Sequence, residues 1–411
     1  MTHITAAALL RGLFIDLTGK PQVVIYQKPS DLKDEIIPSS AMKLEISFAE
    51  SDENAAEIAR KSYENWKKTF VQNKVNSSNT VILPSCAALF IDGKLDAIYW
   101  IDKDIDCTRK RRNEKDSSLR EETINAQGET IIPEERTNVV KNKIALVTGG
   151  AQGIGEEIVR NLAASGSLVI IADLNLEGAQ KLSEDINAKE GRTAALAFKV
   201  NVCDESSVDA LLNAIVETTG GLDICVSNAG VLKAGSVLEQ ELSDFKFVTD
   251  INYTGFFVIC KFAGRLLRTQ HLTARSYKTD IVQINSKSGL EGSNKNGAYA
   301  GGKFGALGLT ASFALELVEY NIKVNAICPG NFLDGPLWSH PEKGLFVQYL
   351  KTGKVAGAKT VADVRSFYEA KVPMKRGCTG KDLVRALYYI IEQEYETGQA
   401  VPVTGGQVML H

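Results

Sequence analysis

From Lys143 onward the chain alternates short apolar runs with longer amphipathic segments, and this alternation constrains the fold more than any other feature. The runs are rich in Val, Ile and Ala and are continuously apolar, which is typical of strands buried on both faces of a parallel sheet. We expect strands at 144–147, 168–172, 194–200, 224–227, 281–285, 323–327 and 400–403. Between the first two runs, Ile154, Ile158 and Leu162 have the spacing of one helix face. The sequence therefore predicts an α/β fold built on a doubly wound parallel sheet.

A glycine-rich turn follows the first expected strand. Residues 148–155 have the sequence TGGAQGIG and lead directly into the helical pattern. Glycine allows the backbone to turn sharply and to approach a diphosphate without a Cβ in the way. The start of the helix offers free N–H groups and the positive end of its dipole to that anion. We predict a dinucleotide diphosphate site formed by Gly149, Gln152, Gly153, Ile154 and Gly155.

An aspartate at the end of the second strand indicates which dinucleotide binds. Asp173 stands 18 residues after Gly155. A carboxylate there can accept hydrogen bonds from the adenosine ribose and repels the 2′-phosphate of NADP. No basic residue occupies Ala151, Gln152 or Leu174 to bind that phosphate. We therefore predict NAD as the cofactor, the alternative being that Asp173 only caps the next helix.

Three residues form a candidate catalytic group. Tyr299 and Lys303 are four residues apart in a helical segment, so they share one face, and Ser286 closes a strand thirteen residues before Tyr299. A tyrosine has a pKa of about 10, and a neighbouring ammonium is expected to lower it. We expect Tyr299 to exchange a proton with the substrate and Ser286 to hold the substrate oxygen. The alternative is a helix-face pair without chemistry.

Further motifs follow the same strands: NAG at 228–230, DINYTG around Asn252, and YAGGK at 299–303. With the glycine turn, Asp173 and Ser286, they resemble the short-chain dehydrogenase/reductase superfamily over residues 143–411. The resemblance implies a Rossmann fold, an NAD-dependent enzyme acting on a CH–OH group, and Asn252 holding a water in a proton relay. It also implies that Lys303 activates the tyrosine and binds ribose. The implied cofactor contacts further include Asn201 (in place of the usual aspartate), Val202, Asn228, Ala229, Gly230, Tyr299, Pro329 and Gly330.

Three further segments bear on the substrate. INSKSG (284–289), KVPMKRGC (371–378) and TGQAVPVTGGQVML (397–410) resemble the sorbitol-6-phosphate 2-dehydrogenases of that superfamily. This implies oxidation of D-sorbitol 6-phosphate to D-fructose 6-phosphate. Two alternatives stay open: a short-chain enzyme acting on another polyol, keto sugar or oxo compound, and a non-catalytic NAD-binding sensor or scaffold.

A sugar phosphate needs cations or N–H donors at a distance from the reacting carbon. We expect Ser286, Lys287, Lys295 and Arg376 to contact the substrate. Segment 331–371 carries Trp338, Phe346 and Tyr349 and is expected to form a lid, because loops at the strand C-termini build the site in such folds.

The first third of the chain differs from the rest. Residues 1–101 mix short apolar runs with one helical pattern at 53–70 and predict a small α/β accessory domain of unknown function, whereas residues 102–142 are dense in charge and predict a linker. A net charge of −3 gives no reason to expect a nucleic-acid partner, and no apolar run approaches the ~18 residues of a membrane span.

Cysteine and histidine usage suggests a compartment. The 7 cysteines include no CxxC pair, and the 4 histidines show no metal-ligand spacing. We therefore expect a cytoplasmic protein without a metal site. The resemblance implies a homodimer or homotetramer.

Overall fold

The computed structural model describes residues 2–18, 20–21, 23–27, 41–46, 51–70, 80–83, 86–91, 94–102, 120–123 and 139–409, the last range without 343, 352 and 354. Among these residues the strands form one sheet of seven strands, one of four and one of two.

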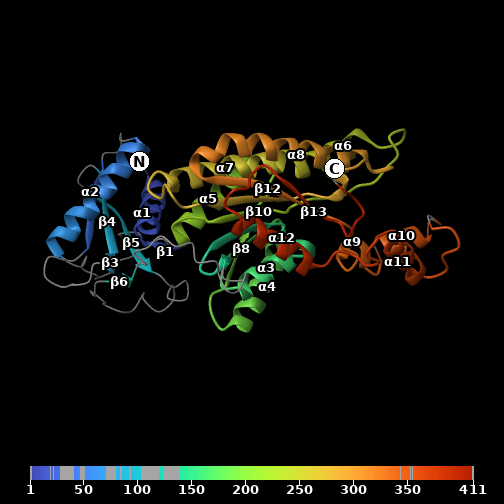
Figure 1. Ribbon diagram of the computed structural model, residues 1–411, viewed down its shortest axis with the longest axis horizontal. Coiled ribbons are helices and arrows are strands. Elements are labelled where there is room, and N and C mark those ends of the chain that lie inside the picture. Colours follow the sequence, from blue (N-terminus) through green and yellow to red (C-terminus); the bar gives the residue numbers. More distant parts are fainter. Residues whose placement is uncertain are drawn as a thin grey trace.

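The largest sheet is parallel throughout and has the order β13-β12-β11-β10-β7-β8-β9 (Figure 1). Its strands are β7 (Ile144–Thr148), β8 (Leu168–Asp173), β9 (Ala195–Lys199), β10 (Ile224–Ser227), β11 (Thr279–Ile284), β12 (Ile322–Pro329) and β13 (Ala400–Val403). The doubly wound parallel sheet is confirmed, with each strand within two residues of its expected bounds. The strand order reverses between β7 and β10, which is where such sheets open a ligand crevice.

Alternate residues of the central strands enter two separate cores. Ile144 and Leu146 of β7 pack with α5 (Glu205–Thr219), α7 (Gly255–His271) and α8 (Gly297–Leu317). Ala145 and Val147 pack on the other face with α3 (Gly153–Ala164), α4 (Leu176–Glu190) and α12 (Gly380–Glu392). Figure 1 shows these helices as two layers around the sheet. Because both faces are covered, the central strands contain continuous apolar runs rather than alternating ones.

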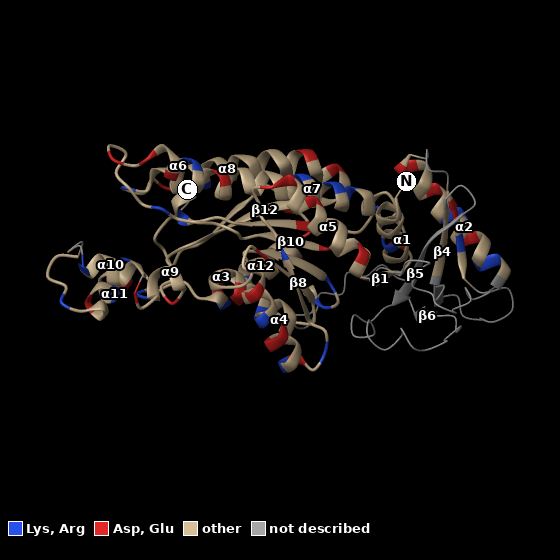
Figure 2. Ribbon diagram, turned by 180° about the vertical axis from the view of Figure 1, so that it is seen from behind, with Lys and Arg blue, Asp and Glu red and all other residues tan. Residues whose placement is uncertain are grey.

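Three short helices follow β12 and form a small core of their own. They are α9 (Pro336–Ser339), α10 (Leu345–Lys351) and α11 (Val361–Ala370). The buried residues of this core, from the helices and the loops between them, are Leu333, Trp338, Leu345, Phe346, Val355 and Val364. We call this segment, residues 331–371, the lid. The lid and the N-terminal region lie at opposite ends of the long axis of the molecule (Figures 1 and 2).

The N-terminal region contains a four-stranded sheet of order β1-β5-β4-β2, formed by β1 (Val23–Gln27), β5 (Lys94–Asp102), β4 (Cys86–Ile91) and β2 (Met42–Ile46). The helix expected at 53–70 is α2 (Asp52–Phe70). A two-stranded sheet pairs β3 (Thr80–Leu83) with β6 (Arg120–Thr123). Strand β6 lies within the segment 102–142 that was expected to be a linker. The division of the chain into an N-terminal domain (1–101), a linker (102–142) and a dehydrogenase domain (143–411) stays a prediction.

Helix α1 (His3–Thr18) joins the N-terminal region to the large sheet. It packs against α7 and α5, and its residues from Ala6 to Ile15 are all buried. Arg11 forms an ion pair with Asp223, just before β10, and both side chains are fully buried. The apolar core around α1 is continuous with the core under α5 and α7. This helix was not predicted from the sequence, because a helix that is covered on all sides has no polar face to reveal its period.

None of the described helices, α1 included, has both the length and the apolar character needed to cross a bilayer.

A short π-helix connects α6 (Leu242–Thr249) to α7. It spans Asp250–Thr254 and contains the expected site residue Asn252, which is buried. One-turn π-helices inside longer helices often occur at functional sites, because the extra residue shifts a side chain out of the regular spiral.

Candidate active site

A cleft of about 1300 Å³ runs along the loops that follow the strands of the large sheet. Its walls come from the glycine turn after β7, the ends of β8 and β9, the loops after β10, β11 and β12, and the lid. A cleft at the carboxyl ends of parallel strands is where ligands bind in open α/β sheets.

The glycine turn is shaped so that only glycine fits at its key positions. Gly149 has a φ of +61°, and a Cβ on it would lie 2.8 Å from the Cα of Ala229. A Cβ on Gly155 would lie 2.1 Å from the carbonyl oxygen of Gly149. Gln152, the N-cap of α3, makes no side-chain hydrogen bond to the helix among the described residues. The first N–H groups of α3 are thus left for an anion, so the turn fits the diphosphate of a dinucleotide.

Asp173 links this turn to the end of β8. Its Oδ2 accepts a hydrogen bond from the backbone N–H of Ala151 at 3.0 Å, and its Oδ1 accepts one from Asn175 at 2.9 Å. The cap of α4 is Asn175, whose side chain accepts from the N–H of Gly178. Asp173 is therefore not the cap of the following helix, and it lines the cleft as expected of a ribose ligand.

The remaining cofactor residues predicted from the family pattern also line the cleft: Asn201, Val202, Asn228, Ala229, Gly230, Pro329 and Gly330. Asn228 braces the glycine turn, since its Nδ2 donates to the carbonyl oxygens of Thr148 and Gly149 at 3.0 and 2.9 Å. Asn201 accepts from the N–H of Cys203 at 3.1 Å, so its carboxamide shapes its own loop.

Ser286, Tyr299 and Lys303 come together at the cleft. Ser286 follows β11, whereas Tyr299 and Lys303 lie in the first two turns of α8. Lys303 is 4% exposed, its Nζ donates to the carbonyl oxygen of Ile284 at 2.8 Å, and this nitrogen lies 5.7 Å from the centre of the Tyr299 ring. A phenol, a hydroxyl and an ammonium are thus placed at one point of the cleft, an arrangement able to transfer a proton to or from a substrate oxygen.

The protonation of this group differs from the expectation. Burial raises the pKa of Tyr299 above its usual range, and a hydrogen bond with Ser286 opposes that rise. Burial also lowers the pKa of Lys303 to about 8. The expected lowering of the tyrosine pKa was therefore wrong for this arrangement of side chains, because burial disfavours the charged form of each group.

Asn252 is held between the π-helix and the loop after β10. Its Oδ1 accepts from the N–H of Val231 at 3.0 Å, and its Nδ2 donates to the carbonyl oxygen of the same residue at 2.7 Å. Both ends of its side chain are thus used to position the 228–231 loop, which lines the cleft.

Comparisons with known proteins agree with this geometry. The family model described as short chain dehydrogenase matches residues 143–340. The sorbitol-6-phosphate 2-dehydrogenase of Escherichia coli (strain K12) is 37% identical over 270 residues, which cover 65% of this chain and 99% of that protein. The chain belongs to the short-chain dehydrogenase family. The trans-4-hydroxycyclohexanecarboxylate dehydrogenase of Sinomonas cyclohexanicum is 31% identical over 274 residues, covering 65% of this chain and 93% of that protein.

Solved structures lead to the same family. The crystal structure of a sorbitol-6-phosphate 2-dehydrogenase from Erwinia amylovora has a TM-score of 0.60 and 39% identity, covering 65% of this chain and all of that one. The structure of an NAD+-bound xylitol dehydrogenase has a TM-score of 0.58 and 28% identity, covering 65% of this chain and 99% of that one. The protein is thus an oxidoreductase of a family that binds NAD or NADP.

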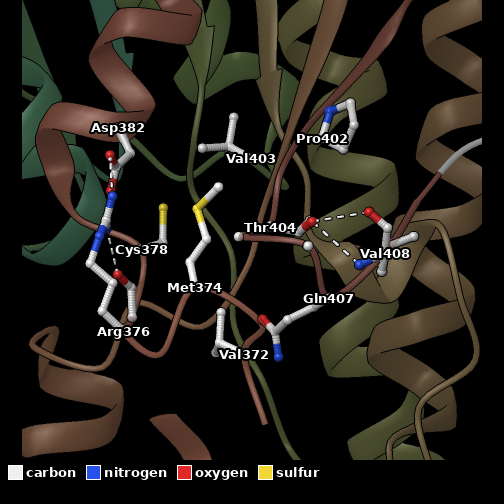
Figure 3. Close-up of a pocket in the computed structure, with 13 residues that line it drawn as sticks. Val372, Met374, Arg376, Cys378, Asp382, Pro402, Val403, Thr404, Gln407 and Val408 are labelled. Atoms are coloured by element: carbon white, nitrogen blue, oxygen red, sulfur yellow. Dashed lines mark hydrogen bonds and ion pairs between the residues drawn. The ribbon is translucent and has the colours of Figure 1, made fainter. Parts of the chain in front are cut away.

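The structure separates the basic residues expected to bind the substrate. Lys287 and Lys295 of this dehydrogenase line the cleft. Arg376 lines a different pocket, between the 372–378 loop and the C-terminal segment, where its guanidinium pairs with Asp382 (Figure 3). That pairing holds the pKa of Asp382 well below its usual range. Arg376 therefore does not line the cleft, because its guanidinium forms an ion pair with Asp382 in the first turn of α12.

Several cleft residues were missed by sequence reasoning, among them Lys371, Asn296 and Gln407. Lys371, at the end of the lid, lies one helical turn after Phe367, a spacing that could have suggested a shared face. Asn296 and Gln407 also line the cleft. Each carries a buried side-chain oxygen that has no hydrogen-bond partner within the described part of the chain. No sequence pattern distinguishes these two carboxamides from surface ones.

Proposed function

We propose that this dehydrogenase oxidises D-sorbitol 6-phosphate at C2 to D-fructose 6-phosphate, with NAD as the oxidant. The observation that carries the proposal is the convergence of Ser286, Tyr299 and Lys303 on a cleft that starts at a dinucleotide-binding turn. The choice of substrate is supported by the names of the relatives from Escherichia coli and Erwinia amylovora, which cover the whole dehydrogenase part at 37% and 39% identity.

In the proposed reaction the substrate hydroxyl at C2 loses its proton to Tyr299. Ser286 holds the same oxygen by a hydrogen bond from its Oγ. Burial raises the pKa of Tyr299, so the positive charge of Lys303 and of a bound nicotinamide would have to oppose burial and stabilise the phenolate that accepts the proton. The C2–H bond breaks as the carbonyl forms. The residues of the glycine turn and Asp173 would hold NAD, whose nicotinamide ring would supply the acceptor for the hydride released from C2.

The remaining residues hold the reactants in place. The N–H groups at the start of α3 would bind the diphosphate, and Asp173 would accept hydrogen bonds from the adenosine ribose, which favours NAD over NADP. Lys303 would also bind the nicotinamide ribose. Asn252 keeps the loop after β10 in position, and we propose that it helps hold a water that connects Lys303 to solvent.

The test is a panel of polyols and polyol phosphates with the full-length protein and NAD, followed by NADH absorbance. We expect a higher kcat/KM for D-sorbitol 6-phosphate than for D-sorbitol, xylitol or meso-2,3-butanediol. Tyr299→Phe should lower kcat by about 10²- to 10⁴-fold, the usual contribution of a general acid or base. Equal kcat/KM values for sorbitol and its phosphate would refute the substrate, and an active Tyr299→Phe variant would refute the mechanism.

A further inference from the structure

The charged residues that line the cleft are unevenly distributed. Among the described lining residues, Asp173 is the one acidic side chain, and it lies at the end of β8 beside the glycine turn. The basic lining residues are Lys287, Lys295, Lys303 and Lys371, all in segments that follow β11 in the chain. Around the catalytic group and the lid, the described lining residues therefore include several lysines and no acidic side chain. Such a surface suits an anionic substrate group.

Two of these four lysines are already engaged. The Nζ of Lys303 donates to a backbone carbonyl beside Tyr299. Lys287 forms an ion pair with Glu291 at 3.0 Å, four residues further along the chain. Lys295 and Lys371, in contrast, have no carboxylate partner within ion-pair distance among the residues that the structure describes. The ammonium groups of these two lysines are therefore available to bind an anionic ligand.

Lys295 occupies a backbone conformation that lysine rarely adopts. Its φ is +54°, in the left-handed region, and its carbonyl oxygen accepts from the N–H of Gly235 at 2.9 Å. Glycine or asparagine is the usual residue at such a position, and other residues there are strained. Because a lysine is not needed for the turn, its presence at the edge of the cleft, four residues before Tyr299, points to a role for the side chain.

Lys371 is held by aromatic rings of the lid. Its Nζ lies 4.3 Å from the centre of the Phe367 ring and 5.5 Å from that of Tyr368. Tyr368 is itself packed against Trp338 and Tyr349, with ring centres 4.8 and 5.5 Å apart, and these three rings line the cleft. The rings restrict the ammonium without neutralising it, which lowers the entropy lost when it binds an anion.

We propose that Lys371 and Lys295 together bind the phosphate group of the substrate, one from the lid and one from the loop before α8. This inference rests on the proposed function and adds which residues recognise the phosphate. Lys371 takes the place that the sequence assigned to Arg376. Because Lys371 belongs to the lid and Lys295 does not, a phosphate bound to both would also connect the lid to the rest of the enzyme.

The test compares the ratio of kcat/KM for D-sorbitol 6-phosphate to kcat/KM for D-sorbitol in wild type, Lys371→Gln, Lys295→Asn and the double variant. Each single change should lower the ratio by about 10- to 100-fold, the effect of losing one hydrogen bond to a charged group. Activity on unphosphorylated sorbitol should fall much less than activity on the phosphate, because that substrate has no phosphate group for the two lysines to bind. Lys371→Arg should keep most of the ratio, because it retains the charge.

Lys295→Asn has a useful second readout. Asparagine tolerates the left-handed backbone better than lysine, so the thermal stability should stay equal or rise while the phosphate preference falls. Lys375→Asn is the matched control, since Lys375 also has a positive φ, of +57°, but does not line the cleft. Lys359→Gln is the control for charge, since this exposed lysine belongs to the lid but does not line the cleft either. Neither control should change the ratio.

The outcomes separate this inference from the proposed function. If wild type prefers the phosphorylated substrate and the double variant keeps that preference, the lysine assignment is wrong and the proposed function stands. If the two controls lower the ratio as much as the cleft variants do, the effect is one of general charge and the assignment is again wrong. If wild type does not distinguish the two substrates, the proposed substrate is wrong and this inference falls with it.

Discussion

The two edges of the large parallel sheet carry similar residues in different arrangements. At the amino ends of the strands, Lys143, Tyr277 and Asp223 form a hydrogen-bonded cluster. Arg11 of α1 completes it by binding Asp223. At the carboxyl ends, Lys303 and Tyr299 lie in a cleft. We call these the amino edge and the carboxyl edge of the sheet. Each has a lysine close to a partly buried tyrosine, but the pair at the carboxyl edge lies in a cleft and has the geometry of an active site.

The difference lies in how the charges are compensated. Both oxygens of Asp223 accept from Nη2 of Arg11, at 2.8 and 2.9 Å, and the carboxylate also accepts from the N–H of Ile144 and the hydroxyl of Tyr277. At the other edge the Lys303 ammonium has a backbone carbonyl as partner and no carboxylate among the described residues. A buried polar group with all its partners supplied by the protein is structural, whereas one that lacks a counter-charge beside an open cleft is available to a ligand.

The largest effect is expected at the amino edge. Arg11→Met would leave the buried Asp223 carboxylate without its counter-charge, and we expect the free energy of unfolding to fall by about 3–5 kcal/mol. Arg268→Met is a suitable control, because Arg268 also joins the two parts of the chain through an ion pair, with Glu53 at 3.5 Å, but both side chains are more than half exposed. Its loss should cost about 0–1 kcal/mol.

Chemical denaturation of both variants would measure this difference, and kcat of the folded Arg11→Met protein at low temperature should match that of wild type. Equal stability losses in the two variants would mean that α1 is not held by its buried ion pair.

A smaller effect is expected at the carboxyl edge, as a dependence of stability on pH. The folded chain holds the pKa of Lys303 at about 8, whereas a lysine in the unfolded chain has a pKa of about 10.4. Between these values the unfolded chain binds a proton that the folded chain does not, so the free energy of unfolding rises with pH. The gain between pH 7 and pH 10 is about 2–3 kcal/mol.

Lys303→Met should abolish this rise, which is measured by denaturation of both proteins from pH 7 to pH 10 without ligands. Burial and Asp223 raise the pKa of Tyr277 well above its usual range, which makes the free energy of unfolding fall as the pH approaches 10. This contribution is the same in both proteins and cancels in the comparison. An identical pH dependence in wild type and variant would show that the Lys303 ammonium is not disfavoured by burial.

The same contrast explains what could be predicted from the sequence. The seven strands, the glycine turn and the Ser286–Tyr299–Lys303 group follow from local patterns, because periodicity and spacing decide which side chains share a face. Helix α1 was missed because it is covered on all sides and shows no polar face, and its polar residue Arg11 has its partner 212 positions away, at Asp223. Such pairing is decided by tertiary packing and leaves no local signal.

The substrate lysines were only partly predictable for a related reason. Arg376 and Lys371 lie in one basic segment, and composition does not show which of them faces the cleft. Arg376 is drawn to Asp382, whose carboxylate also completes the capping box at the start of α12. The sequence motif T-x-x-D at 379–382 predicts that box, so the side chain of Asp382 could have been recognised as a competing partner for the arginine.

The smallest of the three effects concerns an aspartate of the carboxyl edge. Asp173 accepts two backbone hydrogen bonds and lines the cleft, unlike Asp223, whose carboxylate is enclosed by protein donors. Asp173→Ala should therefore lower the preference for NAD over NADP, measured as the ratio of kcat/KM values, by about tenfold, or about 1.4 kcal/mol.

Asp204→Ala is the matched control, because Asp204 also accepts two backbone N–H groups after a strand of the same edge but does not line the cleft. Its loss should reduce stability by about 1 kcal/mol, as for other helix caps, and leave the cofactor ratio unchanged. A wild-type enzyme that used NADP as efficiently as NAD would show that the Asp173 carboxylate does not select the cofactor, even though it faces the cleft.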